Sequence, residues 1–333
     1  MSWSQQIRLK NETKDSRVPN RPKLYTKEFL TREKLDKANR YGFEYYFSKL
    51  TEEQKRMYRL HVEVDSKTRE DAKNSKQGGQ DWHRHRSWVI TLSDLGYFLG
   101  HTEYVNKDGP NPVKDKVQGK KFTKQQIKRM DAGKEDEPKA RAEFMKDMNK
   151  VIRGKIAHAR SAGHKTIEFW EMPEKKFVIP DEVHELLDNS QDIPEDWLLE
   201  YHDDGLIIDP KHPWLGGSSD GRLTLWGLPF AMMEIKRPGT GLYILQPLSH
   251  FVQDQGNMYL SDETYLYHIN WVPSKYRTNL FKFDAEMFEQ CVMPLTTKIF
   301  FENLFPELCK KQPPVQVAQF GNIQIAPEPM ELV

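Results

Sequence analysis

The 333-residue chain has few of the features that mark secreted or membrane proteins. It has two cysteines, Cys291 and Cys309, and neither has the spacing of a metal or redox motif, so a disulfide-stapled fold is excluded. No apolar run reaches the roughly 20 residues needed to cross a bilayer. The N-terminal residues also lack the apolar core of a signal peptide. We therefore expect a soluble, intracellular protein with no membrane partner and with both thiols buried and reduced.

The chain also lacks an excess of charge of either sign. Its 50 basic and 49 acidic residues leave a net charge of +1, so bulk charge gives no support for nucleic-acid binding. Any basic surface must be local, with the acids segregated elsewhere. Hydrophobic residues make up 37% and aromatic residues 11%, which excludes wholesale disorder. The length exceeds the usual domain of roughly 100–200 residues but is compatible with one decorated α/β domain.

The most informative stretch spans residues 216–238, with the sequence GGSSDGRLTLWGLPFAMMEIKRP. Asp220-Gly221 is a turn signal, because glycine tolerates the positive φ of a tight turn. A second turn signal follows at residues 227–229. The runs at 222–226 and 230–236 are rich in strand-forming residues, so the stretch predicts a β-hairpin.

Three residues of this hairpin carry the predicted chemistry. Side chains alternate along a strand, so Glu234 and Lys236 share one face, and the hairpin can bring Asp220 back beside Glu234. Adjacent carboxylates repel, and a divalent cation removes that conflict. Such an ion binds oxygen ligands and phosphate, while Lys236 would assist the attacking water. The group predicts metal-dependent phosphodiester hydrolysis; the alternative is a strand with ordinary surface charges.

Residues 81–100 form the second informative stretch. Ser93-Asp94 is typical of the N-cap of a short helix, and a helix N-terminus with free amides can bind an anion. Arg86 lies seven residues upstream and would complete a phosphate clamp, because its planar fork matches phosphate oxygens. The alternative is a capped helix that packs its apolar side into the core.

The rest of the chain predicts alternating helices and strands. Thr51 is expected to cap a long helix that runs to about Lys73, with Gln54 completing a capping box. Pro138 suits the first turn of another long helix, ending near Ala162. A loop is expected at 101–121. Helices are further expected at 27–46, 123–130, 250–260 and 284–305, and strands at 166–170, 176–179, 206–208, 264–271 and 279–283.

These motifs resemble those of the PD-(D/E)XK nuclease superfamily, and most closely its lambda-exonuclease-type branch, which includes YqaJ-like viral recombinases and alkaline nucleases. The S-P-D-G and E-[IL]-K-x-P motifs match residues 218–221 and 234–238, except for Ser219, where the branch usually has proline. The likeness covers residues 80–260. The motifs W-x-x-x-R-x-x-x-I-T-x-S-[DE] and Q-x-Q-x-x-M are matched by Trp82, Arg86, Ile90, Thr91, Ser93, Asp94, Gln253, Gln255 and Met258.

One position departs from the lambda-type pattern. Many lambda-type exonucleases carry glutamate on a helix where this chain has His158, in a G-x-x-x-H pattern beginning at Gly154 that resembles other branches of the superfamily. The resemblance implies that His158 is a metal ligand. Imidazole favours Mn²⁺ over Mg²⁺ more than glutamate would. The alternative is a hydrogen-bonded core histidine.

The resemblance implies an α/β fold with a restriction-endonuclease-like core at 81–305, built on a central mixed β-sheet flanked by helices. A helical N-terminal extension would occupy residues 1–80, and a Pro/Gln-rich tail residues 306–333. The implied metal ligands for Mg²⁺ or Mn²⁺ are His158, Asp220, Glu234 and the carbonyl of Ile235. The implied catalytic residues are Asp220, Glu234, Lys236 and Gln253, and the implied 5′-phosphate and DNA-binding residues are Arg86, Ser93 and Trp82.

The activity implied by the resemblance is exonuclease digestion of duplex DNA from 5′ ends, in viral or phage-type recombination or replication. Double-stranded DNA ends are the implied partner. A single-strand annealing protein and a homo-oligomer, which is a trimer in relatives, are implied as well. The location would be the host cytoplasm or nucleus if the protein is viral. Two alternatives stay open: an endonuclease of the same fold acting on DNA or RNA, and a non-catalytic scaffold that binds DNA ends.

Overall fold

The computed structural model describes residues 41–100, 111–119, 122–239, 241–243, 246–273 and 275–311. Most of the helix expected at 27–46 and the tail after Lys311 lie outside these residues. Within the described ranges, no helix is both long enough and apolar enough to cross a membrane.

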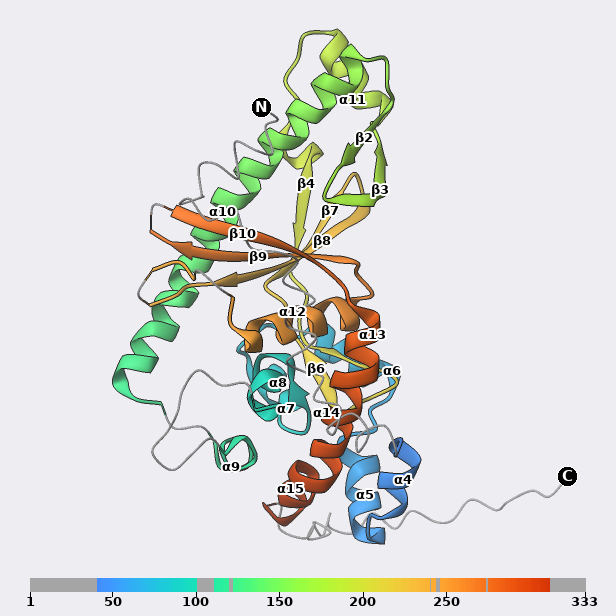
Figure 1. The fold of residues 1–333 in the computed structure, drawn as a ribbon, viewed down its shortest axis with the longest axis vertical. Helices are drawn as coiled ribbons and strands as arrows, with labels where there is room; N and C mark the ends of the chain where they lie inside the picture. The colour runs from blue at the N-terminus through green and yellow to red at the C-terminus, as the bar shows by residue number, and fades with distance from the viewer. Residues whose placement is uncertain are drawn as a thin grey trace, which may run out of the picture.

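A five-stranded sheet forms the centre of the molecule, in the strand order β10-β9-β8-β7-β4 (Figure 1). Strands β8 and β9 run parallel, and the other neighbouring pairs are antiparallel. This mixed sheet, flanked by helices, confirms the expected α/β fold class. The strands are β4 (Leu199–His202), β7 (Gly221–Leu225), β8 (Leu228–Lys236), β9 (Tyr265–Val272) and β10 (Lys275–Lys282).

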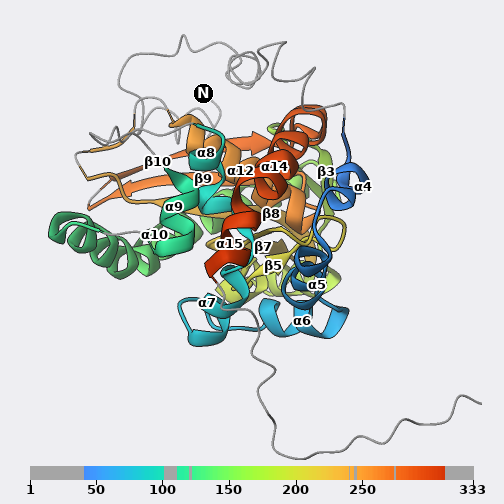
Figure 2. The ribbon, with the colours of Figure 1, turned by 90° about the horizontal axis from the view of Figure 1, so that it is seen from below.

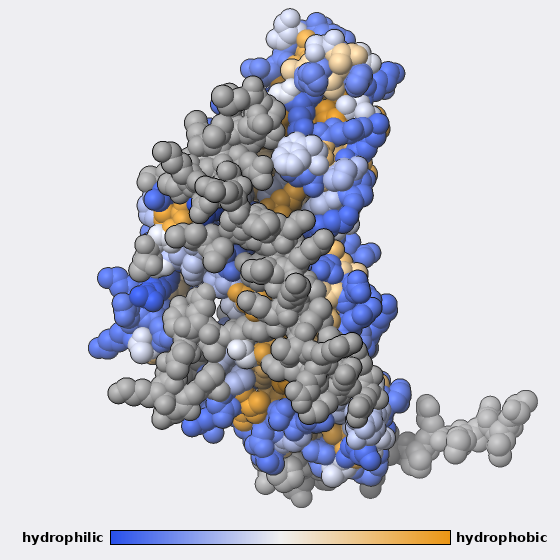
Figure 3. Space-filling view, in the orientation of Figure 1, coloured by the Kyte–Doolittle hydropathy of each residue, from blue (hydrophilic) through white to orange (hydrophobic). Residues whose placement is uncertain are grey.

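One face of the sheet packs against the long helix α10 (Lys124–Ser161), which crosses it diagonally in Figure 1. Apolar side chains of α10 such as Phe144 and Ile152 share a core with Met233 and Ile235 of β8. The N-terminal part of the helix extends beyond the sheet. This protruding part exposes mostly hydrophilic residues (Figure 3).

The expectation of two separate helices in this region is wrong. A capping box between Thr123 and Gln126 starts α10, and the helix continues through Pro138. Proline removes one helical hydrogen bond, but contacts on both sides hold the chain in place. Asp136 forms an ion pair with Arg237, and Ala140 is fully buried.

The other face of the sheet is covered by α12 (Leu248–Ser261), which packs in turn against α8 (Leu92–Phe98). Gly256 permits the close approach of these two helices, because a Cβ atom there would lie 2.4 Å from the side chain of Leu92. Along β8, Met232 and Glu234 point to the α12 side, whereas Met233 and Ile235 point to the α10 side.

A smaller three-stranded sheet has the order β1-β6-β5. Its strands are β1 (Ile90–Thr91), β6 (Leu215–Gly217) and β5 (Ile207–Ile208). β1 pairs in parallel with β6, so Thr91 lies opposite Gly216. Since β6 leads directly to Asp220, this sheet brings the two informative stretches of the sequence side by side.

The N-terminal helices pack against the C-terminal ones (Figure 2). The first are α4 (Phe43–Ser48) and α5 (Glu52–His61), whereas the next helix, α6 (Ser66–Lys73), packs against β5. The C-terminal helices follow one another without a break and are α13 (Ala285–Met287), η2 (Phe288–Val292), α14 (Met293–Ile299), η3 (Phe300–Leu304) and α15 (Phe305–Lys311). The aromatic rings of Tyr46 and Phe301 stack here, with centroids 6.0 Å apart.

The capping box at Thr51 and Gln54 is confirmed, but a single helix from Thr51 to Lys73 is wrong. The chain breaks at residues 62–65, where the side chain of Asp65 caps the new helix α6. The loop expected at 101–121 contains the helix α9 (Pro112–Gln118), while residues 101–110 and 120–121 lie outside the described ranges. The remaining elements are α7 (Gln80–Arg86), β2 (Thr166–Phe169), β3 (Met172–Val178), α11 (Asp181–Asp188) and η1 (Glu195–Trp197).

Candidate active site

The sequence predicts that the hairpin of β7 and β8 brings Asp220 beside Glu234, and in the structure Asp220 hydrogen-bonds to the next residue, Ile235. The Ile235 backbone N–H donates to Asp220 Oδ2 at 2.8 Å. Gly221 makes this approach possible: its φ is 152°, and a Cβ atom there would lie 2.1 Å from the ring of Tyr201. In a strand, the N–H and C=O of one residue leave by the same edge. The carbonyl of Ile235 therefore faces the Asp220 side as well.

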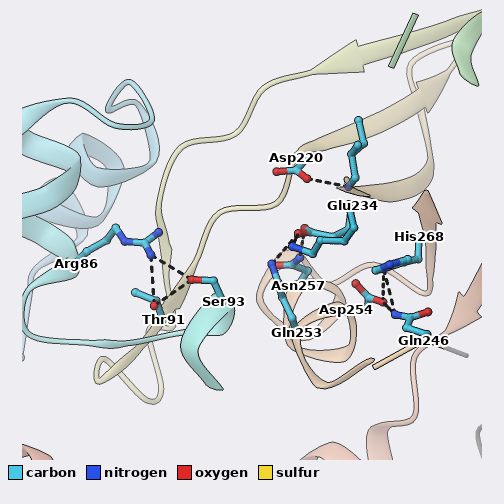
Figure 4. A network of polar contacts seen from close by, with 12 residues as sticks. Arg86, Thr91, Ser93, Asp220, Glu234, Gln246, Gln253, Asp254, Asn257 and His268 are labelled. Atoms are coloured by element: carbon cyan, nitrogen blue, oxygen red, sulfur yellow. Dashed lines mark hydrogen bonds and ion pairs between the residues drawn. The ribbon is translucent and has the colours of Figure 1, made fainter. Parts of the chain in front are cut away.

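Glu234 accepts three hydrogen bonds from side chains of β8 and α12 (Figure 4). Lys236 Nζ and Gln253 Nε2 donate to its Oε1 at 2.6 and 2.7 Å, and Asn257 Nδ2 donates to its Oε2 at 2.9 Å. Glu234 is only 1% exposed. The expected shared face of Glu234 and Lys236 is confirmed. Sequence reasoning missed Asn257, although it follows Gln253 by four residues and so shares its helix face.

The carboxylates of this site resist ionisation. Burial and the neighbouring Asp220 raise the pKa of Glu234 to about 8, although Lys236 opposes that rise. Burial also raises the pKa of Asp220. Burial disfavours the charged form of Lys236, but Glu234 and Asp220 outweigh this effect and raise its pKa. Lys236 alone therefore does not offset the ionised forms of Asp220 and Glu234, and a further cation would stabilise those forms.

A third carboxylate, Glu137 of α10, approaches Asp220. Burial and then the charge of Asp220 raise the pKa of Glu137. Arg141, one turn further along the helix, bonds to Glu137 at 2.8 Å and lies 3.9 Å from the ring centroid of Tyr201. Sequence analysis missed Glu137, because the helix was expected to begin one residue later.

The predicted metal ligand His158 does not meet these acids. It is exposed on α10 and lies 17 residues beyond Arg141, which at 1.5 Å per residue is about 26 Å along the helix. A Cβ atom at Gly154 would also meet only open space. Both readings of His158, as a ligand and as a core histidine, are therefore wrong. The physical reason is the length of α10: the part of the helix around Glu137 passes Asp220, and His158 lies about six turns further along.

The remaining donors fit a hard divalent cation. In the described part of the chain, no group of three His, Cys, Asp or Glu side chains could hold a metal as placed. The donors here are instead two carboxylates, Asp220 and Glu234, with the Ile235 carbonyl. Mg²⁺ is commonly bound by one or two carboxylates together with waters and phosphate oxygens. When bound, such an ion makes water more acidic and offsets charge on a phosphoryl group.

Arg86 forms a polar clamp beside this cluster (Figure 4). Its Nη2 lies 3.2 Å from Ser93 Oγ and 3.4 Å from Thr91 Oγ1, and its guanidinium stacks 3.9 Å from the Trp82 ring centroid. Trp82 Nε1 donates to Ser218 Oγ at 3.0 Å, two residues before Asp220. The three predicted phosphate-binding residues are thus adjacent to one another and joined to the hairpin.

Two cations with lowered pKa values lie at the clamp. Burial lowers the pKa of Arg86, and Asp94 opposes this shift. Burial lowers the pKa of Lys116 on α9 to about 8, an effect that Asp94 opposes and Arg86 reinforces. The expected N-cap at Ser93-Asp94 is wrong: Thr91 is the N-cap, and it makes no side-chain cap hydrogen bond. The group that could hold an anion at the clamp is therefore the Arg86 side chain, not a capped helix N-terminus.

No family model matches this sequence, and neither does any curated protein. Two solved structures are similar to it, both of an alkaline exonuclease (LHK-Exo) from Laribacter hongkongensis, one of them in complex with dAMP. Their sequence identities are 15% and 14%, and each has a TM-score of 0.42 over 70% of this chain and 97% of that chain.

Proposed function

We propose that this chain is a Mg²⁺- or Mn²⁺-dependent deoxyribonuclease that degrades duplex DNA from 5′-phosphorylated ends. The observation that carries the proposal is the convergence of Asp220 and Lys236, both half-buried, on the buried Glu234. Carboxylates buried side by side destabilise a fold unless a cation compensates them. A metal ion and a phosphodiester together would balance this charge.

In the proposed mechanism, Asp220, Glu234 and the Ile235 carbonyl hold the metal. Gln253 orients Glu234 through their 2.7 Å hydrogen bond. Lys236 already donates one hydrogen to Glu234, and its other two can orient the attacking water or a phosphate oxygen. Its positive charge also offsets the charge that develops on the phosphoryl group.

The clamp formed by Arg86, Ser93 and Trp82 supports the proposed preference for 5′-phosphorylated DNA ends. The Arg86 guanidinium matches phosphate oxygens and is held between Trp82 and Ser93. A terminal 5′-phosphate carries more negative charge than an internal phosphodiester, so a cationic clamp favours it. Because Trp82 bonds to Ser218, a phosphate in the clamp would place the adjoining nucleotide near Asp220.

Three substrates test the proposal: a 5′-phosphorylated linear duplex, the same duplex with 5′-hydroxyl ends, and a covalently closed circle. We expect cleavage with Mg²⁺ or Mn²⁺, fastest on the 5′-phosphorylated ends, and an intact circle. Cleavage of the circle at a similar rate would favour the endonuclease alternative. Binding to ends without cleavage under either metal would favour the scaffold.

The clamp itself is tested by Arg86→Ala. Loss of a charge-assisted hydrogen bond of about 1.5–3 kcal/mol should reduce the preference for 5′-phosphate over 5′-hydroxyl ends by roughly 10- to 100-fold. Arg84→Ala is the matched control, because Arg84 lies on the same helix but is exposed and pairs with Asp81 at 3.2 Å. An equal loss of activity on both kinds of end in Arg86→Ala would contradict the role.

A further inference from the structure

A second buried polar cluster lies beside Glu234 and takes no part in the proposed chemistry (Figure 4). His268 of β9 and Asp254 of α12 are both 0% exposed, and His268 Nδ1 lies 2.9 Å from Asp254 Oδ2. Gln246, 4% exposed, donates its Nε2 hydrogen to the same carboxylate oxygen. The three side chains form one buried network between the helix and the sheet.

The sheet register places this cluster directly next to the candidate active site. In the parallel pairing of β8 and β9, Glu234 lies opposite His268, and Lys236 lies opposite Asn270. Residues opposite one another point to the same face, which is the face that α12 covers. On α12, Asp254 directly follows Gln253. The two networks therefore share α12 and lie on the neighbouring strands β8 and β9.

Packing alone does not require polar residues at these positions. The preceding pair on the same face, Met232 and Leu266, is apolar and fully buried. Within the described residues, several atoms of the cluster have no hydrogen-bond partner: Asp254 Oδ1, His268 Nε2 and both amide atoms of Asn270. Buried polar atoms left unpaired reduce stability. The fold thus keeps buried polar side chains that reduce its stability at positions where apolar side chains would pack.

We propose that Asp254 and His268 are positioning residues for the metal site, an inference that rests on the proposed function. The contact between Asp254 and His268 fixes α12 on β9, and this fixes the direction in which Gln253 and Asn257 hold the Glu234 carboxylate. Neither Asp254 nor His268 touches the substrate in this role. Loss of partners that orient metal ligands typically weakens metal affinity 10- to 100-fold.

The test is Asp254→Asn in the full chain, which keeps the side-chain shape and removes its charge. We expect the Mg²⁺ or Mn²⁺ concentration for half-maximal cleavage to rise roughly 10- to 100-fold. The affinity for a 5′-phosphorylated duplex, measured in EDTA, should stay within about twofold, because the clamp lies on other elements. His268→Gln keeps a donor near Asp254 and should shift the metal requirement in the same direction if Asp254→Asn does not fold.

Asp209→Asn is a matched control. Asp209 is also buried, and its Oδ2 lies 2.7 Å from Nδ1 of His212. It contacts α12 through Tyr259, whose Oη donates to Asp209 Oδ2 at 2.9 Å. The hydrogen bonds of the Asp209 side chain go to Lys211, His212 and Tyr259, and not to Glu234. Its loss should lower the melting temperature without changing the metal requirement. Equal shifts in the two variants, or an unchanged requirement in Asp254→Asn, would overturn the positioning role.

Titration calorimetry with Mn²⁺ separates this inference from the proposed nuclease activity. Wild-type protein that binds Mn²⁺ but cleaves no DNA would refute the proposed function and leave the positioning role to be judged from Mn²⁺ affinity. Weaker Mn²⁺ binding by Asp254→Asn than by Asp209→Asn would then support it. Equal Mn²⁺ affinities would reject it.

Discussion

The raised pKa of Glu234 predicts that the metal-free protein loses stability as pH rises. Its pKa is about 8 in the fold, against an ordinary value of 4.5, so the folded state holds this proton after the unfolded chain has lost it. The stabilising contribution is complete below pH 4.5 and is lost as pH rises through about 8. At about 1.4 kcal/mol per pH unit, the shift corresponds to a loss of at most about 5 kcal/mol.

A bound metal ion should reverse this trend, because it compensates the ionised carboxylate. Urea unfolding at pH 6 and pH 9, with and without Mg²⁺, measures both effects. We expect metal-free stability to be lower at pH 9 and stabilisation by Mg²⁺ to be larger there. Asp220 and Glu137, whose pKa values are also raised, act in the same direction.

Two variants test the assignment of this effect to Glu234. Glu234→Gln removes the ionisable group, so the loss of stability between pH 6 and pH 9 should shrink, and so should the stabilisation by Mg²⁺. Glu263→Gln is the control: Glu263 is also buried and also pairs with a lysine, Lys175, at 3.2 Å. It should leave the Mg²⁺ effect unchanged. The same pH dependence in Glu234→Gln as in the wild type would refute the reasoning.

Four further substitutions separate the roles of the residues in and around the site. Lys236→Ala should lower kcat by roughly 10²- to 10³-fold, as for loss of a charge-stabilising group, with duplex binding in a gel-shift assay unchanged; weakened binding would argue against a catalytic role. Glu137→Gln should raise the metal concentration for half-maximal cleavage, while His158→Ala should not. A rise in His158→Ala but not in Glu137→Gln would instead support His158 as a metal ligand. Gly221→Ala should lower the melting temperature, because its Cβ would meet Tyr201; an unchanged melting temperature would contradict the contact.

The sequence predicted the parts of the site that depend on short-range rules. Turn residues and strand alternation predicted the hairpin and the shared face of Glu234 and Lys236, and both are confirmed. The helix expected at residues 250–260 is confirmed as α12, which carries Gln253. These predictions succeeded because strand alternation and turn geometry are decided within a few residues.

Only the tertiary structure decided which residues complete the site. The part of the long helix around Glu137 passes Asp220, while His158, about six turns later, is exposed. The continuation of that helix through Pro138 depends on contacts with distant parts of the chain, including the ion pair of Asp136 with Arg237. The pairing of Asp254 with His268 likewise follows from α12 lying against β9. Such contacts join residues far apart in sequence, and the local pattern around each residue contains no signal of its partner.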